Sequence, residues 1–210
     1  MDRKHFLSVA GVGIAATAAA GLSGCGGGVA GAAAGAAAGA AGAAATSAVG
    51  ARQVAGGGLY VPRGQDRFQR ELMIWGVIPL QIKIATQDTN GALFAFEHAD
   101  MGRGGPPRHF HYEQDEWFYA MKGEFAFEVG DERFTLRPGD SLFAPRMTPH
   151  AWAYTGDEPG TLLLAVQPAG SLEAFFMESC EMTRPPTPEE AEVQFAAHGM
   201  KVVGPPLDIG

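Results

Sequence analysis

The sequence is poor in cysteine and in clustered positive charge. It has only two cysteines in 210 residues, Cys25 and Cys180, which excludes a fold built on a disulfide framework. Charged residues make up 18% of the chain, the formal net charge is −8, and there is no run of lysine or arginine. An acidic chain without basic clusters repels phosphate backbones, so we expect no nucleic-acid partner.

The apolar stretch near the N-terminus is too short to span a bilayer comfortably, and it has the order of parts that an export signal has. Basic Arg3 and Lys4 precede apolar residues 9–22, and small residues lead up to Cys25. Residues 22–25, Leu-Ser-Gly-Cys, resemble a bacterial lipobox, in which cleavage before the cysteine leaves it lipidated. We therefore predict a lipoprotein-type signal peptide over residues 1–24, with a membrane anchor on Cys25 at the periplasmic or extracytoplasmic face.

The sequence leaves open both the export route and the nature of this segment. Residues 3–7 resemble a twin-arginine signal with lysine in the second arginine position, so the Sec and twin-arginine routes both stay open. An ordinary signal peptide, or an alanine-rich helix with an incidental cysteine, is the competing interpretation. Residues 25–58 are almost wholly glycine and alanine, and each glycine in a helix interior costs about 1 kcal/mol. This composition predicts a flexible tether, with a packed glycine-rich helix as the alternative.

From residue 72 onward, short apolar runs separated by turn residues predict an all-β domain over residues 59–210, with its barrel core at about 71–170. The predicted strands cover residues 72–75, 80–86, 92–98, 125–129, 132–136, 141–144, 150–155 and 161–168. This number of strands suits a jelly roll. A C-terminal extension over residues 171–210 follows, with helices predicted at 171–180 and 188–198. Ser171 and Thr187 are the expected caps.

Three histidines and a glutamate could converge on one metal ion. His109 and His111 project from the same face of a strand, because side chains alternate. Glu116 would point away from them on an unbroken strand, so we read residues 112–115 as a turn that lets Glu116 re-enter facing the histidines. His150 would arrive from another strand. Imidazole and carboxylate ligands suit iron, manganese, nickel, copper or zinc, and the set alone selects none of them.

The same residues resemble the two sequence motifs of the cupins. His109, His111, Glu116 and Gly123 match the first motif, and Gly139, Pro145 and His150 match the second. The wider run from residue 71 to residue 207 resembles bacterial cupins grouped near quercetin 2,3-dioxygenases. The resemblance implies a double-stranded β-helix with short C-terminal helices and one divalent transition metal. It also implies that His109, His111 and His150 hold the metal, while Glu116 ligates it or moves to accept a proton.

Three positions depart from the family pattern without touching the ligand set. The glycine that usually opens the first motif sits one position nearer His109, as Gly104, Met147 stands where the second motif usually has glycine, and Tyr154 stands where it often has asparagine. Strand alternation also predicts that Phe118, Trp152 and Tyr154 share the inward face with the ligands. We therefore expect these three and Met147 to form an aromatic substrate pocket. The alternative is that the rings only fill a small barrel.

The leading functional hypothesis is a metal-dependent oxidoreductase of the dioxygenase type with a small aromatic or enolic, flavonol-like substrate. Glu116 would be its catalytic proton acceptor. A ligand-binding lipoprotein without turnover and a cupin isomerase or epimerase are the alternatives, because a fold does not dictate a function. A lone histidine at a strand end, His98, is expected to be structural. Arg108 and Arg146 flank the motifs and are expected to be solvated, with recognition of an anionic substrate as the alternative. A homodimer is the expected assembly, because exposed edge strands often pair.

Overall fold

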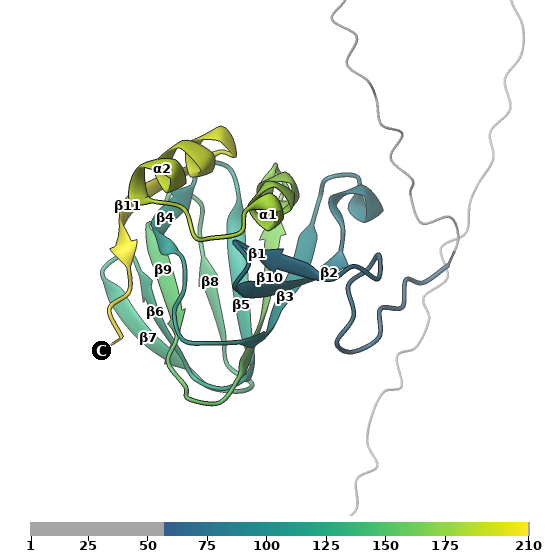
Figure 1. The fold of residues 1–210 in the computed structure, drawn as a ribbon, viewed down its shortest axis with the longest axis horizontal. Coiled ribbons are helices and arrows are strands. Elements are labelled where there is room, and N and C mark those ends of the chain that lie inside the picture. Colours follow the sequence, from purple (N-terminus) through teal and green to yellow (C-terminus); the bar gives the residue numbers. More distant parts are fainter. Residues whose placement is uncertain (1–56, 210) are drawn as a thin grey trace, which may run out of the picture. The chain divides into compact units, whose positions relative to one another are not determined.

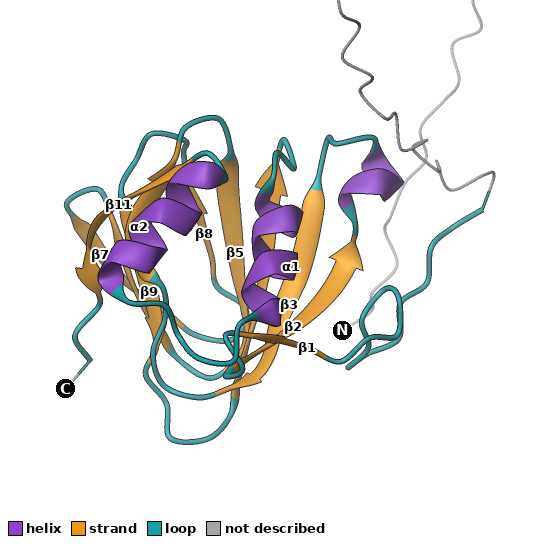
Figure 2. Ribbon diagram, turned by 45° about the horizontal axis from the view of Figure 1, so that its top comes forward, coloured by secondary structure: helices purple, strands orange, loops and turns teal. Residues whose placement is uncertain are grey.

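Two antiparallel β-sheets form the body of the domain in a computed structural model that describes residues 57–209 (Figures 1 and 2). The six-stranded sheet has the order β1 (Leu72–Ile74), β2 (Ile78–Ile84), β3 (Phe94–Met101), β10 (Gly160–Gln167), β5 (Asp115–Lys122) and β8 (Ser141–Ala144). The five-stranded sheet has the order β11 (Met200–Pro206), β4 (Pro107–His111), β9 (His150–Tyr154), β6 (Phe125–Val129) and β7 (Glu132–Leu136). The predicted all-β jelly roll is confirmed.

The core lies between the sheets, and strand alternation selects the residues that fill it. On β5, Phe118 and Ala120 are fully buried, whereas the intervening side chains are only partly so. On β6, Phe125 and Phe127 alternate in the same way, and the Phe127 ring meets Phe118 edge-on at 4.9 Å. Aromatic rings dominate this core, and edge-to-face pairs add a specific geometry to the burial of apolar area.

Two helices cover one end of the sheets. α1 (Leu172–Glu181) and α2 (Pro188–Ala197) follow β10, and both lie over the same end of the domain in Figures 1 and 2. Thr187 caps α2 as predicted. Its hydroxyl accepts from the Glu190 amide, and the Glu190 carboxylate accepts from the Thr187 amide at 2.8 Å. Ser171 occupies the predicted N-cap position of α1, but its hydroxyl makes no cap bond. The hydroxyl instead donates to the His198 carbonyl at 3.0 Å, which joins α1 to the residue after α2.

The sequence did not predict β11. This strand contains Gly204, Pro205 and Pro206, which normally argue against a strand. It lies at the edge of the five-stranded sheet beside β4, with register shifts around Gly204. Prolines are tolerated at such an edge because they need donate no hydrogen bond to a further strand. Between β2 and β3 the chain forms a short 3-10 helix, η1 (Thr86–Thr89).

Several predictions fall on residues outside the described range. The signal peptide over residues 1–24, the lipid anchor on Cys25 and nearly all of the tether over residues 25–58 belong to this group. Within residues 57–209, no helix has the length and apolar character needed to cross a bilayer.

Candidate metal centre

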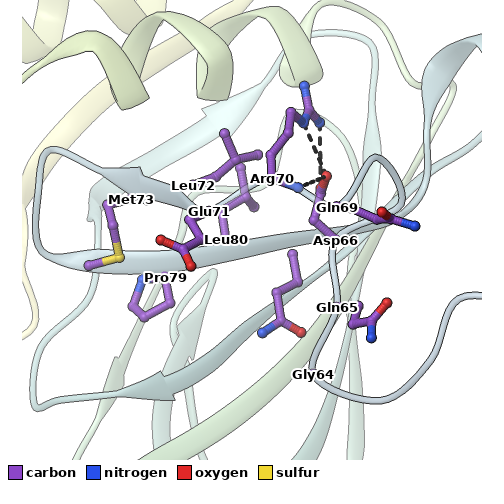
Figure 3. Close-up of a pocket in the computed structure, with 11 residues that line it drawn as sticks. Gly64, Gln65, Asp66, Gln69, Arg70, Glu71, Leu72, Met73, Pro79 and Leu80 are labelled. Atoms are coloured by element: carbon purple, nitrogen blue, oxygen red, sulfur yellow. Dashed lines mark hydrogen bonds and ion pairs between the residues drawn. The ribbon is translucent and has the colours of Figure 1, made fainter.

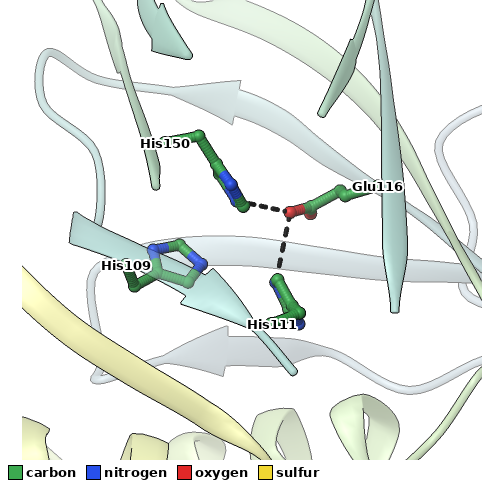
Figure 4. Close-up of side chains that lie close together, drawn as sticks. All are labelled: His109, His111, Glu116 and His150. Atoms are coloured by element: carbon green, nitrogen blue, oxygen red, sulfur yellow. Dashed lines mark hydrogen bonds and ion pairs between the residues drawn. The ribbon is translucent and has the colours of Figure 1, made fainter. Parts of the chain in front are cut away.

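Four side chains from three strands meet at one buried point between the sheets (Figure 4). His109 and His111 come from β4, and His150 lies directly opposite His109 on the neighbouring β9. Glu116 reaches the same point from β5, in the other sheet. All four residues are buried, and one potential ligand atom from each lies within 4.8 Å of the others. The chain therefore brings three imidazoles and one carboxylate together from positions 41 residues apart at most.

The connection between β4 and β5 turns Glu116 toward the histidines, as the spacing predicted. The Tyr112 amide donates to the Gly199 carbonyl at 3.0 Å as the chain leaves β4. At the start of β5, Asp115 accepts two hydrogen bonds from the Arg146 side chain, at 2.7 and 3.0 Å, and a third from the Arg146 amide. These bonds lower the pKa of Asp115 to about 2. They also fix the first residue of β5 against the loop that leads to β9.

The two flanking arginines are engaged within the chain. Arg146 is paired with Asp115, and Arg108 lies 2.9 Å from the Glu128 carboxylate. Neither lines the cavity beside the cluster, which leaves no support for the idea that they recognise an anionic substrate there.

The outer nitrogen of each clustered imidazole has a fixed partner. Nδ1 of His109 lies 2.8 Å from the Pro107 carbonyl, and Nδ1 of His150 lies 3.0 Å from the Thr148 carbonyl. Carbonyl oxygens only accept, so both Nδ1 atoms carry hydrogen, and Nε2 is the nitrogen of each ring that can bind a metal. Such outer hydrogen bonds orient histidines that ligate metals.

Gln114 does the same for His111. Its Oε1 lies 3.0 Å from His111 Nδ1, while its Nε2 donates to the Ala169 carbonyl at 2.6 Å. The second bond fixes the orientation of the amide, so that Oε1 faces the imidazole and His111 also presents its Nε2 lone pair. Sequence reasoning did not single out Gln114. A buried amide within a polar turn between two ligand-bearing strands was the available signal.

The cluster fits a cation. Glu116 Oε2 lies 3.3 Å from His111 Nε2 and 3.1 Å from His150 Nε2, and His111 Nε2 is buried without a well-aligned hydrogen bond. Lone pairs that face one another at these distances need a proton or a metal ion between them. Neighbouring ligands of a metal with bonds of about 2.1 Å are separated by roughly 3.0–3.4 Å, which agrees with both distances. The donor set therefore suits a first-row divalent metal.

The pKa shifts within the cluster, in the absence of a metal, also favour a bound cation. Burial lowers the pKa of His109 well below its ordinary value, and the neighbouring imidazoles add to this effect. Burial also opposes charge on His111 and Glu116, but their mutual attraction outweighs it. The pKa of His111 is raised and that of Glu116 is lowered. The carboxylate thus attracts positive charge to the centre.

A small cavity of about 50 Å³ adjoins the cluster. A buried water needs roughly 10–15 Å³ measured in this way, so the cavity holds about three to five water-sized groups. Its wall is largely apolar and aromatic. The lining includes Phe96 and Trp152 from the sheets, and Leu172, Phe175, Phe176 and Phe195 from the two helices. The helices therefore cover the end of the barrel where the cluster lies.

The predicted pocket residues lie in different places. Trp152 lines the cavity, but Phe118 packs behind the cluster, with its ring 6.1 Å from that of His150. Tyr154 packs on Phe125, and its hydroxyl donates to the Glu158 carbonyl. Met147 has 56% of its surface exposed. Four residues along a strand cover about 13 Å, so sharing a face with His150 does not bring Tyr154 near it.

A larger concave surface than this cavity lies away from the cluster. A pocket of about 600 Å³ lies beside β1 and β2, and Figure 3 shows its wall, which contains none of the four clustered residues. Asp66 in this wall accepts from the amides of Phe68 and Ile82 and pairs with Arg70 at 3.0 Å. These bonds give Asp66 a structural role, and the smaller cavity beside the cluster is the candidate reaction site.

Comparisons with known proteins agree with this architecture. Residues 96–166 match the cupin domain model. The uncharacterised protein MJ1618 of Methanocaldococcus jannaschii is 31% identical over 65 residues, which make up 31% of this chain and 52% of that protein. The chain thus spans about half the length of the curated relative it matches.

Two solved structures are also similar. KdgF from Halomonas sp. is 24% identical over 53% of this chain and 94% of its own, with a TM-score of 0.43. An RmlC-like cupin from Shewanella frigidimarina is 26% identical over 48% of this chain and 84% of its own, with a TM-score of 0.40. The matched residues include the whole buried cluster of three histidines and one glutamate, and this part of the chain is a cupin domain.

Proposed function

We propose that this cupin is a metal-dependent oxidoreductase of the dioxygenase type that acts on a small enolic or single-ring aromatic substrate. The observation that supports it is the set of Nε2 lone pairs on His109, His111 and His150, oriented together with Glu116 beside a closed cavity. These four residues would hold one divalent ion of iron, manganese, nickel, copper or zinc. When bound, such an ion supplies Lewis acidity that favours the deprotonated form of an enol.

Glu116 is the proton acceptor in this proposal. It is the only carboxylate among the residues that line the cavity, and it is 5% exposed. In the arrangement seen here His111 and His150 help to hold its pKa low, which makes it a weak base. Proton transfer from the substrate therefore requires Glu116 to exchange its contacts with these imidazoles for a contact with the substrate hydroxyl.

The cavity limits the size of the substrate. Its volume of about 50 Å³ admits a few heavy atoms, whereas sites for drug-sized ligands have about 300–1,000 Å³. A three-ring flavonol exceeds this space while the helices are closed. The apolar wall excludes water, which protects a deprotonated substrate from reprotonation and strengthens its attraction to the site. A compact enol or diketone is accordingly preferred to a flavonol.

A second candidate is ligand capture without turnover. The largely apolar wall supports it, because such a cavity can retain a small molecule without any reaction.

A metal and oxygen assay separates these candidates. The full-length chain is expressed in metal-replete medium, its metal content is measured, and oxygen consumption is followed with acetylacetone and with quercetin. We expect bound metal and oxygen uptake with the small diketone. His111→Ala should abolish both, whereas His198→Ala removes an imidazole outside the cluster and should abolish neither. Bound metal with ligand binding but no oxygen uptake would favour capture, and a metal-free protein would exclude the first proposal.

We also propose that the chain is exported and anchored through a lipid on Cys25, on the strength of the N-terminal sequence. In a bacterial host, the protein should sediment with membranes and incorporate labelled palmitate. Cys25→Ser should release it from membranes without changing its metal content. Membrane association that survives this substitution would contradict the anchor.

A further inference from the structure

His98 is a polar residue in the cavity that the metal cluster does not use. It lies on β3, is 4% exposed, and lines the same cavity as His109, His111 and Glu116. Its ring is surrounded by aromatic side chains, with centroid distances of 5.3 Å to Phe96, 5.7 Å to Trp152 and 6.0 Å to Phe176. A polar ring in such a setting needs hydrogen-bond partners.

Only one of its two nitrogens has a partner. Nδ1 lies 3.1 Å from the Pro79 carbonyl, which can only accept, so Nδ1 carries hydrogen. Burial lowers the pKa of His98 to about 4, which keeps the ring neutral near pH 7. Nε2 therefore presents a lone pair, and no group within residues 57–209 donates to it. This nitrogen is not among the fully enclosed unpaired atoms, so it keeps accessible surface in the cavity and a ligand there can donate a hydrogen bond to it.

We propose that His98 Nε2 accepts a hydrogen bond from the ligand of the cavity, which is a small molecule with a metal-directed oxygen at one end and a hydroxyl at the other. This inference rests on the proposed function of the metal centre and specifies its substrate class. The neutral imidazole excludes a carboxylate at the distal end, because two acceptors would face each other and no lysine or arginine lines the cavity. An ammonium group would be buried without an anion beside it, which is unfavourable.

Trp75 favours a hydroxyl over other hydrogen-bond donors at the distal end of the ligand. Its indole Nε1 is buried without a hydrogen-bond partner, and the residue lines the same cavity. Trp75 also has a positive φ of 52°, an uncommon conformation for a bulky residue, in the turn between β1 and β2. Its amide donates to the Ser179 carbonyl of α1 at 2.9 Å, which fixes the backbone there. A hydroxyl can donate to an imidazole and accept from an indole N–H, so it suits a wall with one unpaired atom of each kind.

A matched pair of ligands tests the assignment. Glycolohydroxamate and propionohydroxamate bind metals through the same two oxygens, have the same number of heavy atoms, and differ in a terminal hydroxyl or methyl group. The full-length chain is loaded with cobalt, and binding of each ligand is followed by the visible absorption of the metal. We expect the parent protein to bind the hydroxyl ligand about tenfold more tightly than the methyl ligand, as a hydrogen bond to a buried acceptor implies.

The decisive variant is His98→Asn. Its side-chain amide can still donate to the Pro79 carbonyl, but it has no atom at the position of Nε2. We expect the tenfold preference to disappear while cobalt content and melting temperature stay close to the parent values. His98→Leu gives a second comparison if the asparagine variant folds poorly, and the preference of the parent protein is measured without any variant.

The outcomes distinguish this inference from the proposed function. If the parent binds both ligands equally, or if His98→Asn keeps the preference, the role of His98 is wrong and the metal centre is unaffected. If neither ligand changes the spectrum of the cobalt-loaded parent, the metal has no accessible coordination position, and both proposals fail. Binding of both ligands that is lost in His111→Ala would confirm that each one reports on the metal centre.

Discussion

The orientation of His111 depends on one buried amide. Gln114 accepts from His111 Nδ1 and is itself held by the Ala169 carbonyl. Gln114→Leu removes the acceptor, leaves Nδ1 without a partner and lets the ring rotate. We expect metal affinity to fall by about 10–100-fold, as for other losses of outer hydrogen bonds to metal ligands. The measurement is an equilibrium competition for zinc with a fluorescent chelator.

Gln87→Leu is the matched control for this prediction. Gln87 is an exposed residue of η1 and has no role in the cluster. The Gln87→Leu variant should bind zinc with the same affinity as the parent protein. Parental affinity in Gln114→Leu as well would mean that the strand backbone alone holds His111 in place.

The buried His98 should make stability depend on pH. Its pKa is about 4 in the folded protein and 6.5 in the unfolded chain, so the folded state binds fewer protons between these values. The free energy of unfolding is therefore highest above pH 6.5 and falls as the pH is lowered toward 4, by roughly 3 kcal/mol for this group. Urea denaturation at several pH values measures the slope.

His98→Asn should flatten this slope by about one proton between pH 6.5 and 4. Its stability at pH 7.5 serves as the reference, because the imidazole is neutral there in both states. A slope identical to that of the parent would show that His98 is charged, or accessible to water, in the folded protein.

At the scale of residues, the sequence predicted the ligands better than the wall of the cavity. The spacing around His109, His111 and Glu116 depends on strand alternation and one turn, which are local properties. Whether an inward ring such as Tyr154 reaches the cluster depends on its height along the barrel, which alternation does not encode. His98 was expected to be structural, and the bond from Nδ1 to the Pro79 carbonyl agrees with that interpretation.

Among the elements, α2 depends most clearly on a local signal. Thr187→Ala removes the hydroxyl that accepts from the Glu190 amide, which should lower the free energy of unfolding by about 1 kcal/mol. Thr187→Ser keeps the hydroxyl and should retain most of the stability. Chemical denaturation of both variants and the parent measures the difference, and equal losses in both would show that the methyl group, rather than the cap, is responsible.

α2 also packs directly against the cluster of histidines. The Phe195 ring lies 5.1 Å from that of His109 and is 2% exposed. Phe195→Ala should cost about 3–5 kcal/mol of stability and enlarge the cavity. We expect the cobalt-loaded variant to bind benzohydroxamate, which the parent excludes by size, and visible absorption measures this.

Phe195→Leu is the control, because it fills most of the same space. It should lose less stability and continue to exclude benzohydroxamate. Binding of benzohydroxamate to the parent protein would contradict the closed cavity, since it would show that the helices already move aside.

The sequence predicted β6, β7 and β8 with their observed bounds and missed β11. The first three have clear alternation or turn residues at both ends, whereas β11 has glycine and two prolines within it. Its pairing with β4 comes from tertiary structure, because Val202 lies opposite His109 across more than ninety residues of chain. The positions of α1 and α2 over the cavity are likewise set by packing between distant segments, which no local pattern encodes.

For the whole molecule, the cluster connects both sheets. Three ligands belong to the five-stranded sheet and Glu116 to the six-stranded sheet. A metal that binds only the folded state at 100 times its dissociation constant adds about 2.7 kcal/mol. We expect this to raise the melting temperature by roughly 5–10 °C. Scanning calorimetry of the metal-loaded and metal-free full-length chain measures the shift.

His111→Ala should show no such shift on addition of metal, although its apolar core is unchanged. An equal shift in this variant would place the stabilising ion elsewhere in the chain. The expected homodimer, the export signal and the anchor on Cys25 remain predictions from the sequence at this scale.

The small closed cavity also determines how a bound metal could leave. A bulky scavenger such as EDTA cannot enter a space of about 50 Å³ beneath two helices, so it must wait until the protein opens by itself. The half-life of the metal-loaded centre is then set by the rate at which the protein opens spontaneously. Raising the amount of scavenger will stop shortening that half-life once every opening leads to capture.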